Sequence, residues 1–374
     1  MSIDPPGLPQ LVATPESFAE LVGELERQTV IAVDTESNSL HAYRERVCLI
    51  QFSTSERDIV LDPLALEDLA PLAGIFANPG IEKVFHAAEY DLLCLRRDYG
   101  FAFSCIFDTM QAGRILGSRQ AGLDRLLEDK FGVKVSKHYQ KADWGVRPLS
   151  RELLLYAAVD THYLIRLRDL LRIELEAKDL WQLAQEDFRM ACDLTEPKAK
   201  AEPPSWTRFA VRKDLTPREL TILKELLACR DGIASQLDRP PFKVLDDDRL
   251  IDIARAQPGT LAELADLSLS ARQLDRWGGD ILEAVRIGSV APLVARMPNK
   301  HPNGTFLKRL DKLKAWRKKA AAEMDVESDV VLPRDLLLAL AEAGPNEMHS
   351  IMHVSPWRLQ HFGHQIAKVL QLVA

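Results

Sequence analysis

The stretch VIAVDTES at residues 30–37 decides how the chain begins to fold. Its first half is an apolar run typical of a buried β-strand, and acidic residues follow at its end. Side chains alternate between the two faces of a strand, so Asp34 and Glu36 share one face. We therefore expect an early strand of a sheet that presents two carboxylates at its end.

Two further acidic motifs follow along the chain. Asp91 in HAAEYD opens a predicted helix after the strand 81–85, and Tyr156 and Asp160 lie in a segment with helical periodicity. A separation of four residues places Tyr156 and Asp160 on one helical face. Several carboxylates that converge without a cation would repel one another. We therefore expect them to surround hard divalent ions, Mg²⁺ or Mn²⁺, used in phosphoryl chemistry.

The order of these motifs is more informative than any one of them. With 55 Asp and Glu residues in a chain of 374, about eight acidic-x-acidic triplets are expected by chance. A Tyr-x-x-x-Asp pair is also common on helix surfaces. The prediction rests on an acid pair on a strand, then an acid at a helix start, then a tyrosine and an acid on a later helix.

This order resembles the DEDD superfamily of 3′→5′ exonucleases, in the branch whose third motif carries a tyrosine. The stretches VCLIQFST (47–54) and ADWGVRPLSRELLLYAAVDTHYL (142–164) are similar to ribonuclease D and to its eukaryotic relative in the nuclear exosome. Ser37 departs from the pattern, because bacterial ribonuclease D usually has an aromatic residue there. The departure concerns stacking of the terminal base and leaves the acidic residues unchanged.

The resemblance implies an α/β ribonuclease H-like exonuclease domain, with a mixed sheet flanked by helices. It implies a metal-dependent 3′→5′ exoribonuclease that trims RNA 3′ ends, as in tRNA precursor processing, and releases nucleoside 5′-monophosphates by a two-metal-ion mechanism. Tyr156 has an ordinary pKa near 10, so it orients the attacking water rather than acting as a full base. The residues expected to hold the two metal ions are Asp34, Glu36, Asp91 and Asp160.

The spacing of the predicted elements indicates the sheet topology. Short connections join the strands expected near 30–34, 46–54 and 58–62, which favours antiparallel pairing. Later β-α-β stretches favour parallel crossovers. The expected elements of that part are a helix at 65–78, a strand at 81–86, a helix at 88–99 and a strand at 103–107.

The second half of the chain repeats itself. Pairing each position with the one 87 residues further on aligns Arg230 with Arg317 and Leu245 with Leu332. Trp277 and Phe362, each followed by glycine, align after a gap of two residues, and we expect both in helical cores. Two copies of one small helical domain explain the pattern, and each resembles the HRDC domain. The expected divisions are an exonuclease domain (1–192), a linker (193–212), an HRDC domain (213–292) and a second HRDC-like domain (293–374).

The charge distribution limits how a polyanion could bind. The net charge of −7 argues against binding by the whole surface, so local basic features and the metals must hold RNA. The basic cluster within 300–320 is one such feature, and the segment just before Tyr156 is another. The residues predicted to contact RNA are Lys141, Trp144, Arg147, Lys308, Arg309, Lys312, Arg317 and Lys318.

The remaining composition indicates an intracellular enzyme. The five cysteines show no Cys-x-x-Cys spacing and are expected to be reduced core residues. The start MSIDPPGLPQ lacks a signal-peptide pattern, and no apolar run of membrane-spanning length occurs, so we expect a cytoplasmic location and no membrane partner.

Two other functions stay open at this stage. A DNA 3′ exonuclease of the proofreading or repair type would use the same carboxylates, because the choice of sugar depends on contacts to the 2′-hydroxyl. An RNA-binding adaptor without catalysis is the second alternative, and the complete set of carboxylates with Tyr156 argues against it. The favoured partner is RNA with a free 3′ end.

Overall fold

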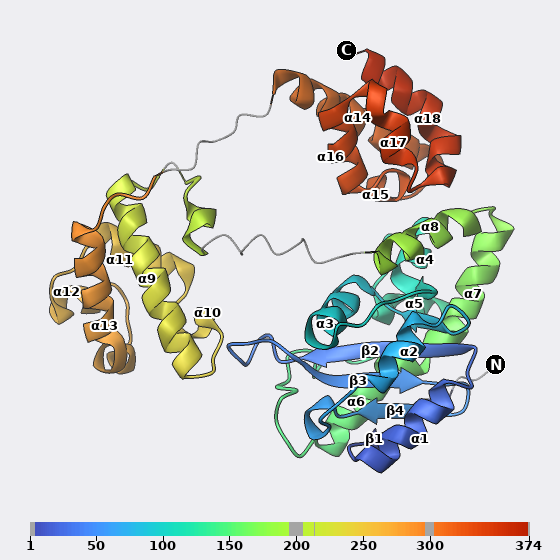
Figure 1. Cartoon of the computed structure of the whole chain (residues 1–374), viewed down its shortest axis with the longest axis horizontal. Helices are drawn as coiled ribbons and strands as arrows, with labels where there is room; N and C mark the ends of the chain where they lie inside the picture. The colour runs from blue at the N-terminus through green and yellow to red at the C-terminus, as the bar shows by residue number, and fades with distance from the viewer. Residues whose placement is uncertain (1–3, 194–204, 213, 296–302, 373–374) are drawn as a thin grey trace. The chain divides into compact units, whose positions relative to one another are not determined.

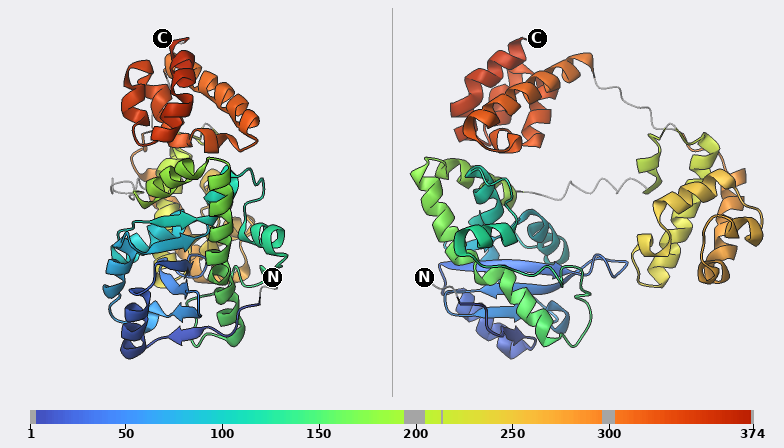
Figure 2. Two further views of the ribbon diagram at one scale, coloured as in Figure 1. Left: turned by 90° about the vertical axis from the view of Figure 1, so that its right-hand side faces the viewer. Right: turned by 180° about the vertical axis from the view of Figure 1, so that it is seen from behind.

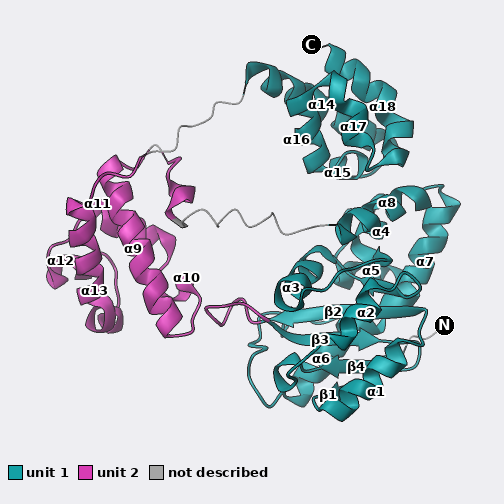
Figure 3. Cartoon of the chain, viewed as in Figure 1, with its two compact units in different colours: residues 1–37, 47–196, 302–374 teal, residues 38–46, 197–301 magenta. Residues whose placement is uncertain are grey.

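The computed structural model describes residues 4–193, 205–212, 214–295 and 303–372. The chain divides into two compact units (Figure 3), one of residues 1–37, 47–196 and 302–374 and the other of residues 38–46 and 197–301. Most of the predicted linker, residues 194–204, lies outside the described residues. Within the described residues, no helix is both long and apolar enough to cross a bilayer.

A mixed sheet of six strands forms the centre of the N-terminal part, in the order β1-β4-β3-β2-β5-β6 (Figure 1). The antiparallel pairing of β2 with β3 and of β3 with β4 is confirmed, as is the parallel pairing of β5 with β2 and β6. Strand β1, parallel to β4, was not expected, because three residues are too few to show a periodicity. The strands are β1 (Gln10–Val12), β2 (Val30–Ser37), β3 (Val47–Ser53), β4 (Asp58–Leu61), β5 (Glu82–Phe85) and β6 (Ile106–Asp108).

Helices flank this sheet, which confirms the predicted fold class. Helix α6 packs on β2, β3 and β4, and in the view from behind in Figure 2 it lies across these strands. The helix predicted at 65–78 is shorter, because Pro71 sets its first turn. The helices are α1 (Pro15–Leu25), α2 (Pro71–Ala77), α3 (Glu89–Tyr99), α4 (Thr109–Ile115), α5 (Leu123–Phe131), α6 (Arg151–His162), α7 (Leu164–Ala177) and α8 (Trp181–Cys192).

The C-terminal half contains the repeat. The first copy comprises α9 (Pro217–Gln236), α10 (Pro241–Val244), α11 (Asp247–Ala256), α12 (Leu261–Ala265) and α13 (Ala271–Val290). The second copy comprises α14 (Gly304–Met324), α15 (Ser328–Val331), α16 (Arg334–Ala343), α17 (Met348–Met352) and α18 (Pro356–Gln371). The bounds of α15, α16 and α17 are those of α10, α11 and α12 shifted by 87 residues.

Paired residues of the repeat make the same contacts. Arg230 Nη1 donates to the carbonyl of Leu245, and Arg317 Nη1 donates to that of Leu332, each at 2.9 Å. Phe362 is buried, and Trp277 is partly buried against its own core. Both aromatic residues therefore belong to cores, as expected.

The second copy packs against helix α8 within the first unit. Arg358 on α18 is fully buried, and its Nη1 donates to Asp187 Oδ1 of α8 at 2.7 Å. Ser355 Oγ donates to Glu186 Oε2, also of α8, at 2.5 Å. Arg114 on α4 adds a salt bridge to Glu327 at 2.6 Å. Polar contacts, some of them buried and one exposed, thus join residues that the sequence places in different domains.

Candidate active site

Strand β2 delivers the first two acids. Asp34 and Glu36 pair across the antiparallel ladder with Gln51 and Leu49 of β3, and both lie on one face of the sheet because their spacing is two. The register shifts just after Glu36, so regular pairing ends there. The carboxylates therefore lie where the regular β2–β3 ladder ends.

Helix α6 delivers the second pair. Ser150 caps its start by accepting from the backbone N–H of Leu153 at 3.3 Å. Near its end, the hydroxyl groups of Ser53 and Thr161 are hydrogen-bonded to each other at 2.7 Å, which fixes the helix on β3. Tyr156 and Asp160 lie one turn apart on this fixed helix and line one cavity with Asp34 and Glu36.

Three of the carboxylates converge. One oxygen from each of Asp34, Glu36 and Asp160 lies within 4.8 Å of the others. Atoms that share a cation at 2.0–2.6 Å can be at most roughly 5 Å apart, so this separation fits a shared divalent ion. Hard oxygen donors without a thiol or imidazole among them suit Mg²⁺ or Mn²⁺.

Asp91 lies beside this group on helix α3. It is buried, and its Oδ1 accepts a hydrogen bond from Thr35 Oγ1 on β2. It is not one of the three carboxylates that lie within 4.8 Å of one another. Its charge is nevertheless close enough to raise the pKa of Asp34 and of Glu36. A ligand role for Asp91 stays a prediction.

Burial and mutual repulsion dominate the electrostatics of the site. Burial raises the pKa of Glu36 to about 9, with Asp160 and Asp91 adding to the effect. Burial also raises the pKa of Asp91 to about 7 and that of Asp160 to about 7. The pKa of Asp34 is raised by burial and by its three acidic neighbours. A divalent cation would offset these costs, so the residues present fit the predicted metals.

Tyr156 is positioned by aromatic neighbours. Tyr139 meets its ring edge-on at 5.7 Å, and Trp144 lies at 6.1 Å. Burial and the charges of Asp160, Glu36 and Asp34 raise the pKa of Tyr156 above its ordinary value. The hydroxyl therefore keeps its proton and acts as a hydrogen-bond donor.

Several residues of the cavity were not expected. His86, Lys137 and Gln140 line it, and the cavity has a volume of about 370 Å³. Lys137 Nζ forms a salt bridge to Asp124 at 2.9 Å, which lowers the pKa of that carboxyl. Burial lowers the pKa of His86 to about 4, so its ring is neutral at pH 7. In the sequence, the position of His86 in the HAAEYD motif was the one feature that could have placed it in this cavity.

Two expected RNA contacts before Tyr156 are corrected. Trp144 is 1% exposed and packs on Tyr156, so it cannot reach a nucleic-acid backbone. Arg147 binds Asp62 with Nε and Nη2 at 2.5 and 2.7 Å, and it also donates to the carbonyls of Trp144 and Cys48. Its guanidinium group therefore has a structural role. Lys141 is exposed next to Gln140, and its RNA contact stays a prediction.

The basic residues of helix α14 that were expected to contact RNA also fall into two groups. Arg309 and Arg317 contact other parts of the second copy, to which α14 belongs, and donate to the carbonyls of Glu342 and Leu332. The RNA contact expected of these two arginines is replaced by a role in packing. Lys308, Lys312 and Lys318 are exposed, and their contact with RNA stays a prediction.

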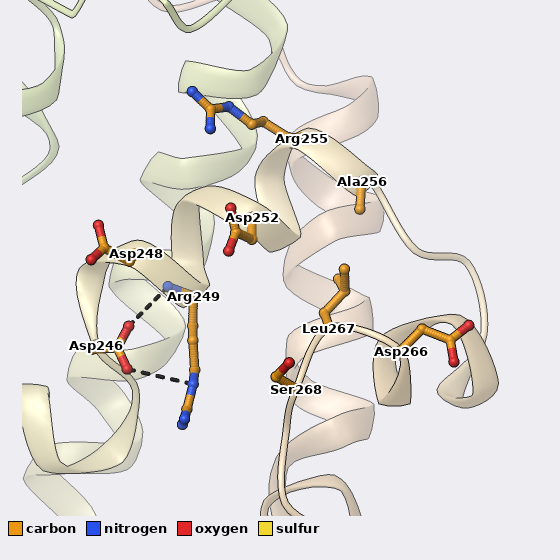
Figure 4. A pocket seen from close by; sticks show the side chains of 9 residues that line it. All are labelled: Asp246, Asp248, Arg249, Asp252, Arg255, Ala256, Asp266, Leu267 and Ser268. Carbon is orange, nitrogen blue, oxygen red and sulfur yellow. Dashed lines mark hydrogen bonds and ion pairs between the residues drawn. The ribbon is translucent and has the colours of Figure 1, made fainter.

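A second hollow, on the first copy, has a different character. Figure 4 shows the carboxylates of Asp246, Asp248, Asp252 and Asp266 along its lining. Arg249 and Arg255 are the cations among its lining residues, and Arg249 pairs with Asp246 at 3.5 Å. A lining rich in carboxylates repels phosphates, so this hollow does not suit RNA.

Comparisons with known proteins agree with this site. A family model described as 3′-5′ exonuclease matches residues 9–176, and the HRDC domain model matches residues 219–285 and 306–370. The exosome complex exonuclease RRP6 of Saccharomyces cerevisiae is 34% identical over 268 residues, which are 67% of this chain and 36% of RRP6. The chain thus spans well under two thirds of RRP6.

Bacterial relatives match over more of their length. Ribonuclease D of Gluconacetobacter diazotrophicus is 31% identical over 290 residues, which are 76% of this chain and 73% of that protein. The crystal structure of Escherichia coli RNase D, an exoribonuclease involved in structured RNA processing, has a TM-score of 0.70 and 25% identity. That match covers 97% of this chain and 98% of the other. This chain therefore belongs to the ribonuclease D family of 3′→5′ exonucleases with HRDC domains.

Proposed function

We propose that this chain is a metal-dependent 3′→5′ exoribonuclease that trims RNA 3′ ends, including those of tRNA precursors. The observation that carries the proposal is the convergence of Asp34, Glu36 and Asp160 within 4.8 Å in a cavity that Tyr156 also lines. RNA is preferred over DNA as substrate because the relatives that match most of this chain are ribonucleases. A cytoplasmic location remains a prediction.

Two divalent ions, Mg²⁺ or Mn²⁺, are the proposed cofactors. Asp34, Glu36 and Asp160 would hold them, with Asp91 completing the set. When bound, such ions stabilise the negative charge that develops on the phosphate and favour ionisation of water.

The side chains would divide the remaining work. The protonated hydroxyl of Tyr156 would orient the attacking water by a hydrogen bond. Lys137, held at the cavity by Asp124, would neutralise a substrate phosphate. Water adds to the terminal phosphorus and the bond to the 3′ oxygen breaks, which releases a nucleoside 5′-monophosphate and a shortened 3′-hydroxyl end.

The test compares substrates and metals directly. Purified full-length protein is incubated with 5′-end-labelled tRNA precursor and with single-stranded DNA of matched sequence, each with Mg²⁺, Mn²⁺ or EDTA. We expect stepwise shortening of the RNA with either ion, release of 5′-monophosphates and no reaction in EDTA. Cleavage in EDTA, or faster shortening of DNA than of RNA, would overturn the proposal.

A further inference from the structure

Two side chains, Asp108 and Thr109, hold the turn 85–88, which leads into the helix that carries Asp91. Asp91 lies in the first turn of α3, whose N-cap residue Ala88 makes no side-chain capping bond. A helix start leaves backbone N–H groups without partners, so another part of the protein must satisfy them. Asp108, at the end of β6, binds two N–H groups at this start: its Oδ1 accepts from Ala87 N at 3.0 Å and its Oδ2 accepts from the N-cap Ala88 N at 2.9 Å.

The same carboxylate also caps the next helix. Asp108 Oδ1 accepts from the N–H groups of Met110 and Gln111 at 2.8 and 3.2 Å, at the start of α4. One side chain therefore joins the starts of two helices. Asp108 is 3% exposed, and its two oxygens accept four backbone hydrogen bonds, so this carboxylate near the site is engaged by backbone donors.

Thr109 holds the same turn through Phe85 and His86. Its Oγ1 donates to the carbonyl of Phe85 at 3.1 Å and lies 2.9 Å from Nδ1 of His86. Because the single hydroxyl proton is used on Phe85, Thr109 accepts from the Nδ1–H of His86. This bond leaves Nε2 of His86 as an acceptor. Thr109 is 0% exposed, so water does not compete for these bonds.

The turn needs such support. Ala87 has φ of 62°, a left-handed conformation that costs free energy for any residue with a Cβ. Without the bonds from Asp108, Ala87 would relax toward ordinary backbone angles, and the first turn of α3 would move with it. Asp91 would then shift relative to Asp34 and to Thr35, its hydrogen-bond partner.

We propose that Asp108 and Thr109 are positioning residues of the metal site, which fix the turn 85–88 and thereby the place of Asp91. The proposal rests on the proposed function, since it assumes that the carboxylates bind divalent ions. Residues that orient metal ligands from behind typically change metal affinity by about 10- to 100-fold when they are replaced. The effect should therefore appear in metal binding before any RNA is added.

The experiment titrates full-length protein with Mn²⁺ alone and measures free Mn²⁺ from its aqueous electron paramagnetic resonance signal. We expect Asp108→Asn to weaken Mn²⁺ binding by about 10-fold or more, because an amide offers one acceptor oxygen in place of two. Asp246→Asn is the matched control, since Asp246 caps α11 through Arg249 N at 2.9 Å in the first copy. The control should bind Mn²⁺ as the wild type does.

A second pair of variants covers the case in which Asp108→Asn does not fold. Thr109→Val removes the hydroxyl, and Thr109→Ser keeps it. We expect Val to weaken Mn²⁺ binding and Ser to preserve it. Wild-type affinity in folded Asp108→Asn, or equal affinity in both Thr109 variants, overturns this inference alone. A wild-type protein that binds no Mn²⁺ overturns the proposed function as well.

Discussion

Two groups of partly buried carboxylates in the first unit differ in what balances their charge. At the sheet, Asp34, Glu36 and Asp160 face one another, and burial raises the pKa of each. At the contact between α8 and α18, Asp187 instead binds the guanidinium group of Arg358 through both of its oxygens, at 2.7 and 3.0 Å. The protein supplies a cation in the second group and none within the tight trio of the first.

The difference separates a binding site from a structural contact. Burying a charge is costly unless a partner offsets the loss of water. The contact at α8 is complete within the chain, so it stabilises the attachment of the second copy. The cluster at the sheet is complete only with an external cation, which is the property expected of a metal site.

The largest expected effect comes from removing a charge of the unpaired cluster. Asp34→Asn or Asp160→Asn should lower kcat by about 10³-fold or more at saturating Mg²⁺, because each removes charge that the ions need. Single-turnover cleavage of end-labelled RNA measures the loss. Asp248→Asn, an exposed carboxylate of the first copy, is the control and should react at the wild-type rate. Turnover near the wild-type rate in either site variant would contradict the assignment of the site.

The next largest effect is expected from removing the hydroxyl of Tyr156, which lines the same cavity as the three carboxylates. Tyr156→Phe should lower the rate of cleavage by about 10²- to 10⁴-fold while RNA affinity stays nearly constant, since the hydroxyl only orients water. Tyr163→Phe removes a hydroxyl just after the end of α6 and serves as control. Equal losses of rate and affinity in Tyr156→Phe would indicate instead that the hydroxyl positions the RNA.

Breaking the paired group should affect stability more than chemistry. Arg358→Gln leaves the partly buried Asp187 without its fully buried cation, and we expect a loss of about 3–5 kcal/mol in the free energy of unfolding of the first unit. Urea unfolding followed by tryptophan fluorescence measures it. Arg249→Gln removes a partly exposed pair in the first copy and should change stability by about 1 kcal/mol or less. A loss no larger than that of the control would show that the buried network does not hold the second copy.

The pH dependence of stability offers a subtler comparison. In EDTA, the folded carboxyls of Asp91, Asp160 and Glu36 have pKa values of about 7, 7 and 9, against about 4 when unfolded. The folded state therefore binds more protons in this range, and stability should fall as pH rises through these values. Thermal unfolding should show a midpoint that decreases between about pH 5 and 9, and saturating Mg²⁺ should reverse the decrease. A midpoint that stays level in EDTA would speak against the buried, unpaired state of the cluster.

The smallest effect is expected from the exposed lysines of α14, which should change RNA binding only. Replacing Lys308, Lys312 and Lys318 together by Gln should weaken RNA binding about equally for all sequences. It should also reduce the slope of log affinity against log salt concentration, by about 1 for each phosphate that these lysines neutralise. Filter binding at several salt concentrations measures the slope. Lys224 and Lys243 of the first copy, replaced in the same way, provide the control. Equal slopes in both variants would remove α14 from the RNA-binding surface.

Local spacing explains which parts of the site could be predicted. A period of two placed Asp34 and Glu36 on one face, and a separation of four did the same for Tyr156 and Asp160. Both arrangements follow from the backbone geometry of a strand or a helix. This geometry is the same wherever the strand or helix packs in the fold. The repeat of 87 residues was readable for the same reason, because matched helices need matched apolar positions.

Burial and contacts between distant segments could not be read in this way. Trp144 and Arg147 looked like surface residues before a motif, yet one is buried against Tyr156 and the other binds Asp62. His86 and Lys137 reach the cavity only because a strand and a loop far apart in the chain end at the same place.

Spacing along the chain was enough to predict the order of the catalytic motifs, the strand and helix that carry them, and the duplication of the helical domain. Knowledge of the long-range packing was needed to show that Asp108 holds the turn before Asp91 and that Arg358 attaches the second copy to α8. Those roles depend on which polar groups meet when water is excluded. That outcome is set by the packing of segments remote in sequence, which no local period encodes.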